Sequence, residues 1–181
     1  MNLLSKNFYL LCLILLFPLP VLANGDVASI FNTINLRLTY MQDVALYKAQ
    51  HHLAIEDVAR EKKVLASATR AASQLGLPTN KVDAFFKAQI AVAKAIQYRY
   101  RAQWLASAVS GNAPRDLQTQ VRPALIKLGE QLNKELADYV MQGGRFVPTQ
   151  YKAFSDAIKV KYVTVPDKNL LFNALMQITD P

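Results

Sequence analysis

Apolar residues recur with a helical period along almost all of residues 24–181, and the alternation typical of strands is nearly absent. This pattern limits the fold to one built from packed helices. Glycine, proline and capping residues divide the chain into six expected helices, at about residues 26–52, 57–75, 81–107, 117–141, 149–158 and 167–178. The sequence therefore predicts a single all-α domain, without an internal repeat and long enough to bury a core.

The first 23 residues, MNLLSKNFYLLCLILLFPLPVLA, contain one lysine before a long apolar run that ends in prolines and small residues. These are features of a secretory signal peptide. A retained membrane anchor is the weaker alternative, because Pro18 and Pro20 interrupt a run that is short for a bilayer. We expect cleavage after Ala23, export to the periplasm or the medium, and no membrane attachment afterwards. The only cysteine, Cys12, lies in this segment, so we expect no thiol chemistry in the mature protein.

The chain carries a formal net charge of +8, and loss of Lys6 with the signal peptide lowers it to +7. A basic exported domain suggests an anionic partner, such as nucleic acid, a membrane surface or a small polyanion. The segment QYRYRAQW, residues 97–104, interleaves bases and aromatics as a surface for single-stranded nucleic acid does. On a helix, however, these side chains point in several directions, and no further basic run extends the surface. We therefore expect a small anion and no nucleic-acid partner.

Two cations, Arg37 and Lys48, lie eleven residues apart, which is only about 20° more than three helical turns. They therefore share one face of the first expected helix, with Met41 and Val44 between them over about 16 Å. Two interpretations are open. Arg37 and Lys48 either line a pocket, or they pack their aliphatic parts on the core while their charged groups reach water. A break between the first two helices would turn Arg60 back toward the same space.

The motifs of covalent and metal-assisted catalysis are missing from the sequence. It contains no GxSxG, HExxH, CxxC, Walker or GxGxxG motif. The adjacent His51 and His52 are poor metal ligands, since neighbours on a helix diverge and no third ligand stands at a suitable spacing. We therefore expect no metal and no cofactor. An enzyme without these motifs would act by positioning its substrate and by electrostatic stabilisation of charge.

The residues around the cationic face follow one another at a distinctive spacing. After Arg37 come a lysine, an aspartate, an adjacent arginine and glutamate, and one helix later a glutamine: Lys48, Asp57, Arg60, Glu61 and Gln97. This pattern resembles the all-helical chorismate mutases. The segments AIEDVAR at 54–60, FKAQI at 86–90 and AIQY at 95–98, with Trp104, resemble the exported subclass in particular. The resemblance covers roughly residues 30–130.

This resemblance implies a fold, an assembly and a reaction. The fold would be a three-helix core at about residues 26–108 with a C-terminal helical extension at about 115–181. The assembly would be a homodimer with a complete site in each chain. The reaction would be the rearrangement of chorismate, a small dianion, to prephenate within one molecule, without acid, base, metal or cofactor.

The resemblance also implies which residues bind the two carboxylates of the substrate. Arg37 and Arg122 would each take one, because the planar fork of arginine can form two parallel bonds to a carboxylate. Arg60 would assist on the ring side. The alternative for Arg122, which stands before Pro123, is an ordinary surface arginine.

Other residues would contact the ether oxygen and the ring hydroxyl. Lys48 and Gln97 would donate to the ether oxygen, on which negative charge grows in the transition state. Glu61 and Asp57 would accept from the hydroxyl. Gln97 by itself is equally well explained as a buried amide with satisfied hydrogen bonds.

The sequence departs from the family pattern at Ala93, where relatives usually have serine or threonine one turn before the glutamine. One hydroxyl contact to a carboxylate would then be missing. The disulfide known in some exported relatives is also impossible here. Two further alternatives stay open on this scaffold: an isochorismate pyruvate lyase, and an exported binding protein without catalytic activity.

Overall fold

The computed structural model describes residues 24–107 and 113–179 of the chain. The described residues form seven α-helices with two short helical segments and no strand: α1 Asn24–Thr39, α2 Met41–Gln50, α3 Val58–Gln74, α4 Thr79–Ala106, η1 Leu117–Val121, α5 Arg122–Met141, η2 Pro148–Gln150, α6 Tyr151–Ala157 and α7 Val165–Ile178. The predicted all-α class is confirmed. The predicted signal peptide, residues 1–23, lies outside the described residues, so its cleavage stays a prediction.

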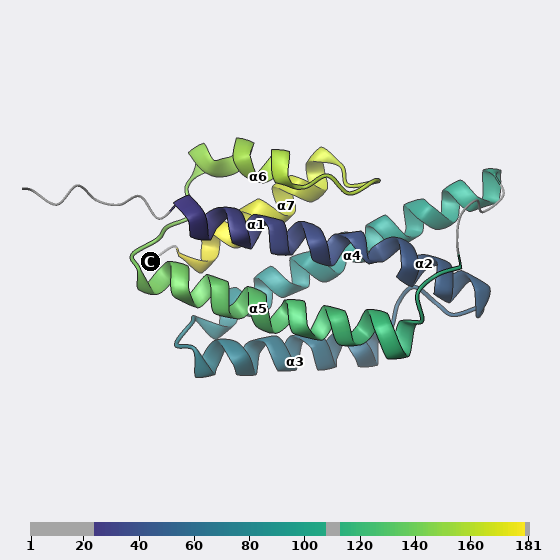
Figure 1. Ribbon diagram of the computed structural model, residues 1–181, viewed down its shortest axis with the longest axis horizontal. Coiled ribbons are helices and arrows are strands. Elements are labelled where there is room, and N and C mark those ends of the chain that lie inside the picture. Colours follow the sequence, from purple (N-terminus) through teal and green to yellow (C-terminus); the bar gives the residue numbers. More distant parts are fainter. Residues whose placement is uncertain (1–23, 108–112, 180–181) are drawn as a thin grey trace, which may run out of the picture.

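The first expected helix is divided, which the sequence did not predict. α1 ends at Thr39, and α2 begins at Met41 and continues in nearly the same direction (Figure 1). The Thr39 hydroxyl donates to the Leu36 carbonyl at 2.6 Å, an acceptor that an unbroken helix would pair with the amide of Tyr40. Because Tyr40 keeps nearly helical angles, φ −68° and ψ −13°, the face shared by residues on both sides is largely preserved.

The next helix boundaries follow the local chemistry of the sequence. Asp57 caps α3 by accepting from the amide of Arg60 at 3.0 Å, as its side chain predicts. α3 ends before Gly76, whose φ of +72° suits a residue without a side chain. α5 begins at Arg122, so Pro123 stands in its first turn, where the missing N–H costs little.

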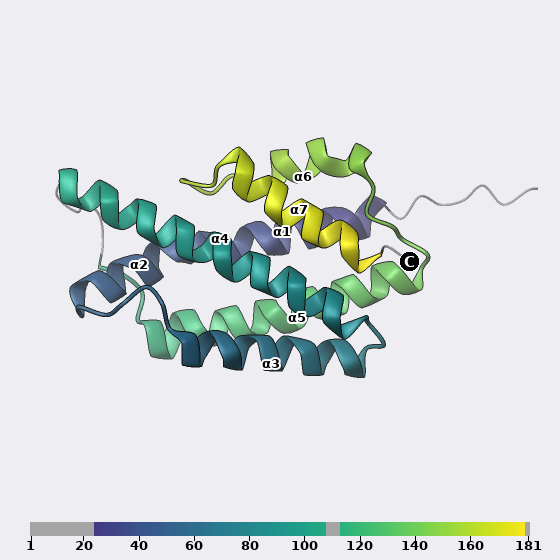
Figure 2. The same cartoon turned by 180° about the vertical axis from the view of Figure 1, so that it is seen from behind.

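α4 is the longest helix and packs against α2, α3 and α7. Figures 1 and 2 show α3 and α5 side by side along one edge, with α6 and α7 along the opposite edge. α5 packs on both α1 and α3, so it completes a wall around the space between the first helices. The predicted C-terminal extension is therefore part of the enclosure of this space.

The core is rich in phenylalanine and joins the C-terminal helices to the first ones. Phe31 of α1 makes edge-to-face contact with Phe154 of α6 and Phe172 of α7, at centroid distances of 5.2 and 6.5 Å. All three rings are almost completely buried. Such pairs stabilise a core beyond the burial of their area. Within the described residues, none of the helices combines the length and apolar character that a membrane span requires.

Candidate active site

A cavity of about 320 Å³ lies between α1, α2, α3, α4 and α5. Its walls are largely apolar and include Leu38, Met41, Val44 and Phe86. Every residue that the sequence predicted to contact a substrate also lines it: Arg37, Lys48, Asp57, Arg60, Glu61, Gln97 and Arg122. The tertiary structure thus gathers side chains from five helices and one connecting segment around a single space.

Arg37 is held on three sides inside the cavity wall. Its Nε donates to Gln89 Oε1 at 2.8 Å, and one terminal nitrogen donates to the Leu125 carbonyl at 3.0 Å. The guanidinium lies over the Phe86 ring, 5.4 Å from its centroid. Burial lowers the pKa of Arg37 to about 10, so the group still carries its charge at neutral pH. A cation fixed in this way is preorganised for an anion.

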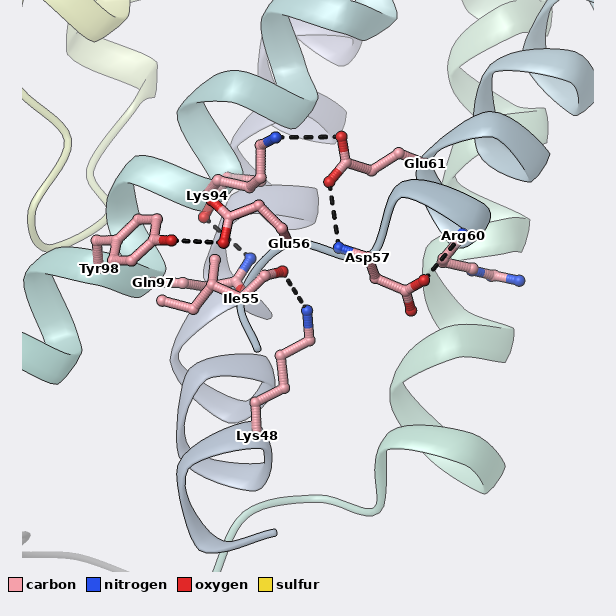
Figure 3. A network of polar contacts seen from close by, with 10 residues as sticks. Lys48, Ile55, Glu56, Asp57, Arg60, Glu61, Lys94, Gln97 and Tyr98 are labelled. Atoms are coloured by element: carbon pink, nitrogen blue, oxygen red, sulfur yellow. Dashed lines mark hydrogen bonds and ion pairs between the residues drawn. The ribbon is translucent and has the colours of Figure 1, made fainter. Parts of the chain in front are cut away.

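Lys48 is buried, with 8 % of its surface exposed, whereas Arg37 is half-buried. Its ammonium donates to the Ile55 carbonyl at 2.5 Å, which ties the end of α2 to the segment before α3 (Figure 3). Burial lowers the pKa of Lys48, while the negative charge of Asp57 acts in the opposite direction and the positive charge of Arg122 adds to the lowering. Lys48 therefore lies on the helix face that the sequence predicted, and its ammonium is part of the cavity wall.

Two carboxylates of the cavity already have cationic neighbours. Asp57 Oδ2 lies 3.5 Å from a terminal nitrogen of Arg122, and Glu61 Oε2 lies 3.1 Å from Lys94 Nζ. Glu61 also accepts from the Asp57 amide at 3.4 Å, as Figure 3 shows. Arg122 makes a second contact, to Gln118 Oε1 at 2.5 Å. These pairs place carboxylate acceptors next to cations in the cavity wall.

Arg60 stands apart from the other predicted cations. It lines the cavity, yet Figure 3 shows its side chain pointing away from Lys48 and Gln97. The turn between α2 and α3 does bring Arg60 to the shared space. Its guanidinium, however, is directed away from the ammonium of Lys48 (Figure 3).

Gln97 is buried and only partly satisfied. Its Nε2 donates to the Ala93 carbonyl at 3.1 Å and approaches Met41 Sδ at 3.6 Å. Its Oε1 has no partner among the described residues. The interpretation of Gln97 as a fully satisfied core amide is therefore wrong, because a buried amide oxygen without a donor is costly.

Sequence reasoning missed several polar residues of the cavity wall, among them Gln89, Lys94 and Asn133. Gln89 precedes Gln97 by eight residues on α4, so a search for polar residues at helical spacing would have found it. Asn133 is 1 % exposed and donates weakly to the Ala68 carbonyl at 3.4 Å. Lys94 gave no signal, because a lysine on a long helix ordinarily faces solvent.

The two histidines considered as metal ligands are exposed at the end of α2. His51 stacks on Tyr47, with ring centroids 3.9 Å apart. In residues 24–107 and 113–179, no three metal-binding side chains come together in one place.

These features define a class of protein: a helical domain with a cavity between its helices, whose arginine, lysine and amide groups can bind a small anion. The family described as chorismate mutase type II matches residues 28–98. A monofunctional chorismate mutase of Enterobacter agglomerans is 37% identical over 153 residues, which are 84% of this chain and 83% of that protein. A secreted chorismate mutase of Yersinia pestis is 37% identical over 145 residues, 80% of this chain and 77% of its own length.

Solved structures agree with this class. The crystal structure of secreted chorismate mutase from Yersinia pestis matches with a TM-score of 0.76 and 36% identity, covering 82% of this chain and 96% of that one. A chorismate mutase from Burkholderia thailandensis matches with a TM-score of 0.70 at 24% identity, covering 86% and 99%, and so supports the fold. The chain belongs to the chorismate mutase type II family. Its members are isomerases, and the resemblance read from the sequence is confirmed.

Proposed function

We propose that this protein rearranges chorismate to prephenate in the cavity described above. The reaction breaks one C–O bond and forms one C–C bond within the substrate, so no atom leaves and no proton needs to move. The observation that supports it best is the pair of cations in the wall of one largely apolar cavity, Arg37 half-buried and Lys48 buried. Family membership supports the same reaction.

The two carboxylates of the substrate would be bound by Arg37 and Arg122. Arg37 is fixed by Gln89 and the Leu125 carbonyl, which leaves three of its five N–H bonds for a ligand. Arg122 donates to Gln118 Oε1 at 2.5 Å, but its contact to Asp57 is 3.5 Å long. An incoming carboxylate can therefore compete with Asp57 for Arg122. Binding both carboxylates would hold the substrate in the compact conformer that reacts.

The ether oxygen would receive hydrogen bonds from Lys48 and Gln97. Both residues are buried, and a preorganised donor in such a site is worth roughly a hundred- to a thousandfold in rate. Gln97 must exchange its bond to the Ala93 carbonyl for one to the substrate, at little net cost because one hydrogen bond replaces another. The ring hydroxyl would donate to Glu61 or Asp57, and Arg60 would assist from the edge of the cavity.

Purified mature protein mixed with chorismate tests this proposal. We expect the absorbance of chorismate to fall as prephenate appears, with kcat about a hundredfold or more lower for Lys48→Met, which keeps length and removes charge. Lys87→Met is the matched control, because Lys87 lies on the surface of α4 and pairs with Asp83. No prephenate from the wild-type protein would contradict the proposal.

The same preparation separates the alternatives. A lyase would release pyruvate from isochorismate faster than the protein converts chorismate. A binding protein without catalytic activity would bind a dicarboxylate mimic of the transition state tightly and show no turnover. Retention of single-stranded nucleic acid that falls with salt would revive the nucleic-acid alternative.

We also propose that the mature protein is exported, to the periplasm or the medium, and forms a homodimer. The secreted relative and the N-terminal segment support export. One chain supplies every residue assigned above, so each protomer of such a dimer would carry a complete site. Cell fractionation and light scattering on the purified protein test the two statements separately.

A further inference from the structure

Gln89 lies on α4 with 3 % of its surface exposed. It contacts Arg37, which stands 52 residues earlier in the sequence. Its Oε1 accepts from Arg37 Nε at 2.8 Å. A guanidinium only donates, so this bond fixes which end of the amide faces Arg37. The Nε2 of Gln89 must therefore point elsewhere.

That Nε2 group is buried and has no partner among the described residues. An unsatisfied buried donor of this kind costs about 1 to 3 kcal/mol. Gln89 lines the cavity, so a ligand bound there can supply the missing acceptor after a small rotation of the amide. In native structures such unsatisfied groups are rare and require an explanation.

The neighbouring positions of α4 show where an extra donor is needed. Residues 89, 93 and 97 follow one another at one-turn intervals and all line the cavity. Ala93 has only a methyl group, so of these three positions only 89 and 97 carry a side-chain donor. A carboxylate beside Arg37 has about four acceptor sites, more than Arg37 alone would fill.

We propose that Gln89 is a further substrate-binding residue, whose Nε2 donates to the same substrate carboxylate that Arg37 binds. The identity of the substrate rests on the function proposed above. Gln89 then has two parts with separate roles: Oε1 orients Arg37, and Nε2 contacts the ligand. It takes the place of a hydroxyl that position 93 does not provide.

The competing explanation is that Gln89 only orients Arg37. A double-mutant cycle separates the two, because a residue that acts only through Arg37 has no effect once Arg37 is gone. The variants are Gln89→Met, Arg37→Met and the pair together, and kcat/KM for chorismate is measured for each. Gln103→Met is the matched control, since it makes the same change on the same helix outside the cavity.

We expect Gln89→Met to lower kcat/KM about tenfold, the effect of losing one hydrogen bond to a charged group, mostly through KM. In the Arg37→Met background it should lower kcat/KM a further threefold or more. No further loss in that background overturns the proposal. Circular dichroism melting of each variant shows that the loss is not one of folding, and Gln103→Met should keep the wild-type kcat/KM.

A second cycle gives a gain of function instead of a loss. Ala93→Ser places a hydroxyl between the two glutamines, and we expect it to raise kcat/KM more in the Gln89→Met protein than in the wild type. An equal effect in both backgrounds overturns the proposal. The proposed function is tested with the wild-type protein alone. If that protein forms prephenate and the Gln89 variants do not behave as expected, only the role given to Gln89 is contradicted.

Discussion

Gln97 brings a neutral amide to a cavity in which most groups assigned to the substrate carry formal charge. An amide donates a hydrogen bond at any pH, whereas a carboxyl group donates only when it is protonated. Gln97 is 4 % exposed, so a carboxyl group in its place would lie away from water, next to Met41 and Ala93. The protonation of one residue would then control the donor to the ether oxygen.

We predict that wild-type turnover is nearly constant across neutral pH and that Gln97→Glu is active only toward acid pH. The physical reason is that burial favours the neutral form of a carboxyl group, while ionisation removes its only donor. A pH profile of kcat for both proteins checks this. A wild-type rate that collapses above mildly acidic pH would remove Gln97 from the role of ether donor.

At the scale of elements, α5 decides how closely the cavity wall approaches Arg37. The carbonyl of Leu125 accepts from Arg37, and Gly129, one turn later, leaves room for the guanidinium. A Cβ at position 129 would lie 3.1 Å from a terminal nitrogen of Arg37, which is a crowded contact. A glycine inside a helix destabilises it by about 1 kcal/mol relative to alanine. The helix thus contains a less favourable residue where the cation needs space.

We predict that Gly129→Ala leaves the melting temperature unchanged or raises it, while KM for chorismate rises about fivefold. Alanine favours the helix, but its methyl group moves the guanidinium and weakens one charge-assisted hydrogen bond by about 1 kcal/mol. Thermal melting and steady-state kinetics of the same preparation check both effects. An unchanged KM would show that Arg37 is free to move, contrary to its three contacts.

For the whole molecule, the C-terminal helices are attached without a disulfide, because the chain has a single cysteine. Arg99 of α4 donates to both oxygens of Asp167 in α7 and to the Tyr162 carbonyl. Asp167 also accepts from Thr164, which caps α7. Burial raises the pKa of Asp167, but the hydrogen bonds from Arg99 and Thr164 outweigh it and hold the pKa below its usual range. This ion pair therefore anchors the end of the chain to the central helix.

We predict that Asp167→Asn lowers the free energy of unfolding by about 1 to 2 kcal/mol at neutral pH, with allowance for the partial exposure of Arg99. Because the folded-state pKa is depressed, this contribution is present above the ordinary carboxyl pKa and disappears as pH falls through the folded pKa. Urea unfolding across acid pH checks this. Asp156→Asn, in an exposed pair with Lys152, is the control, and an equal loss in both variants would contradict the anchoring role.

Much of the fold follows from sequence patterns that act over short distances. The helical period, the cap at Asp57, the stop at Gly76 and the proline at the start of α5 fix the helices within a few residues. The division at Tyr40 escaped prediction, because it depends on a single hydroxyl that competes for a backbone acceptor. The pattern of cations also identified the family, since the spacing of Arg37 and Lys48 survives this division.

The sequence by itself determined the helical class and the face that Arg37 and Lys48 share, because helical periodicity places residues on faces. Only the tertiary structure decided how those side chains are directed and paired. Arg37 meets Gln89 and the Leu125 carbonyl, and Glu61 meets Lys94, across helices that are distant in sequence. The physical reason is that such contacts depend on the angles between packed helices and on individual rotamers, which no local pattern encodes.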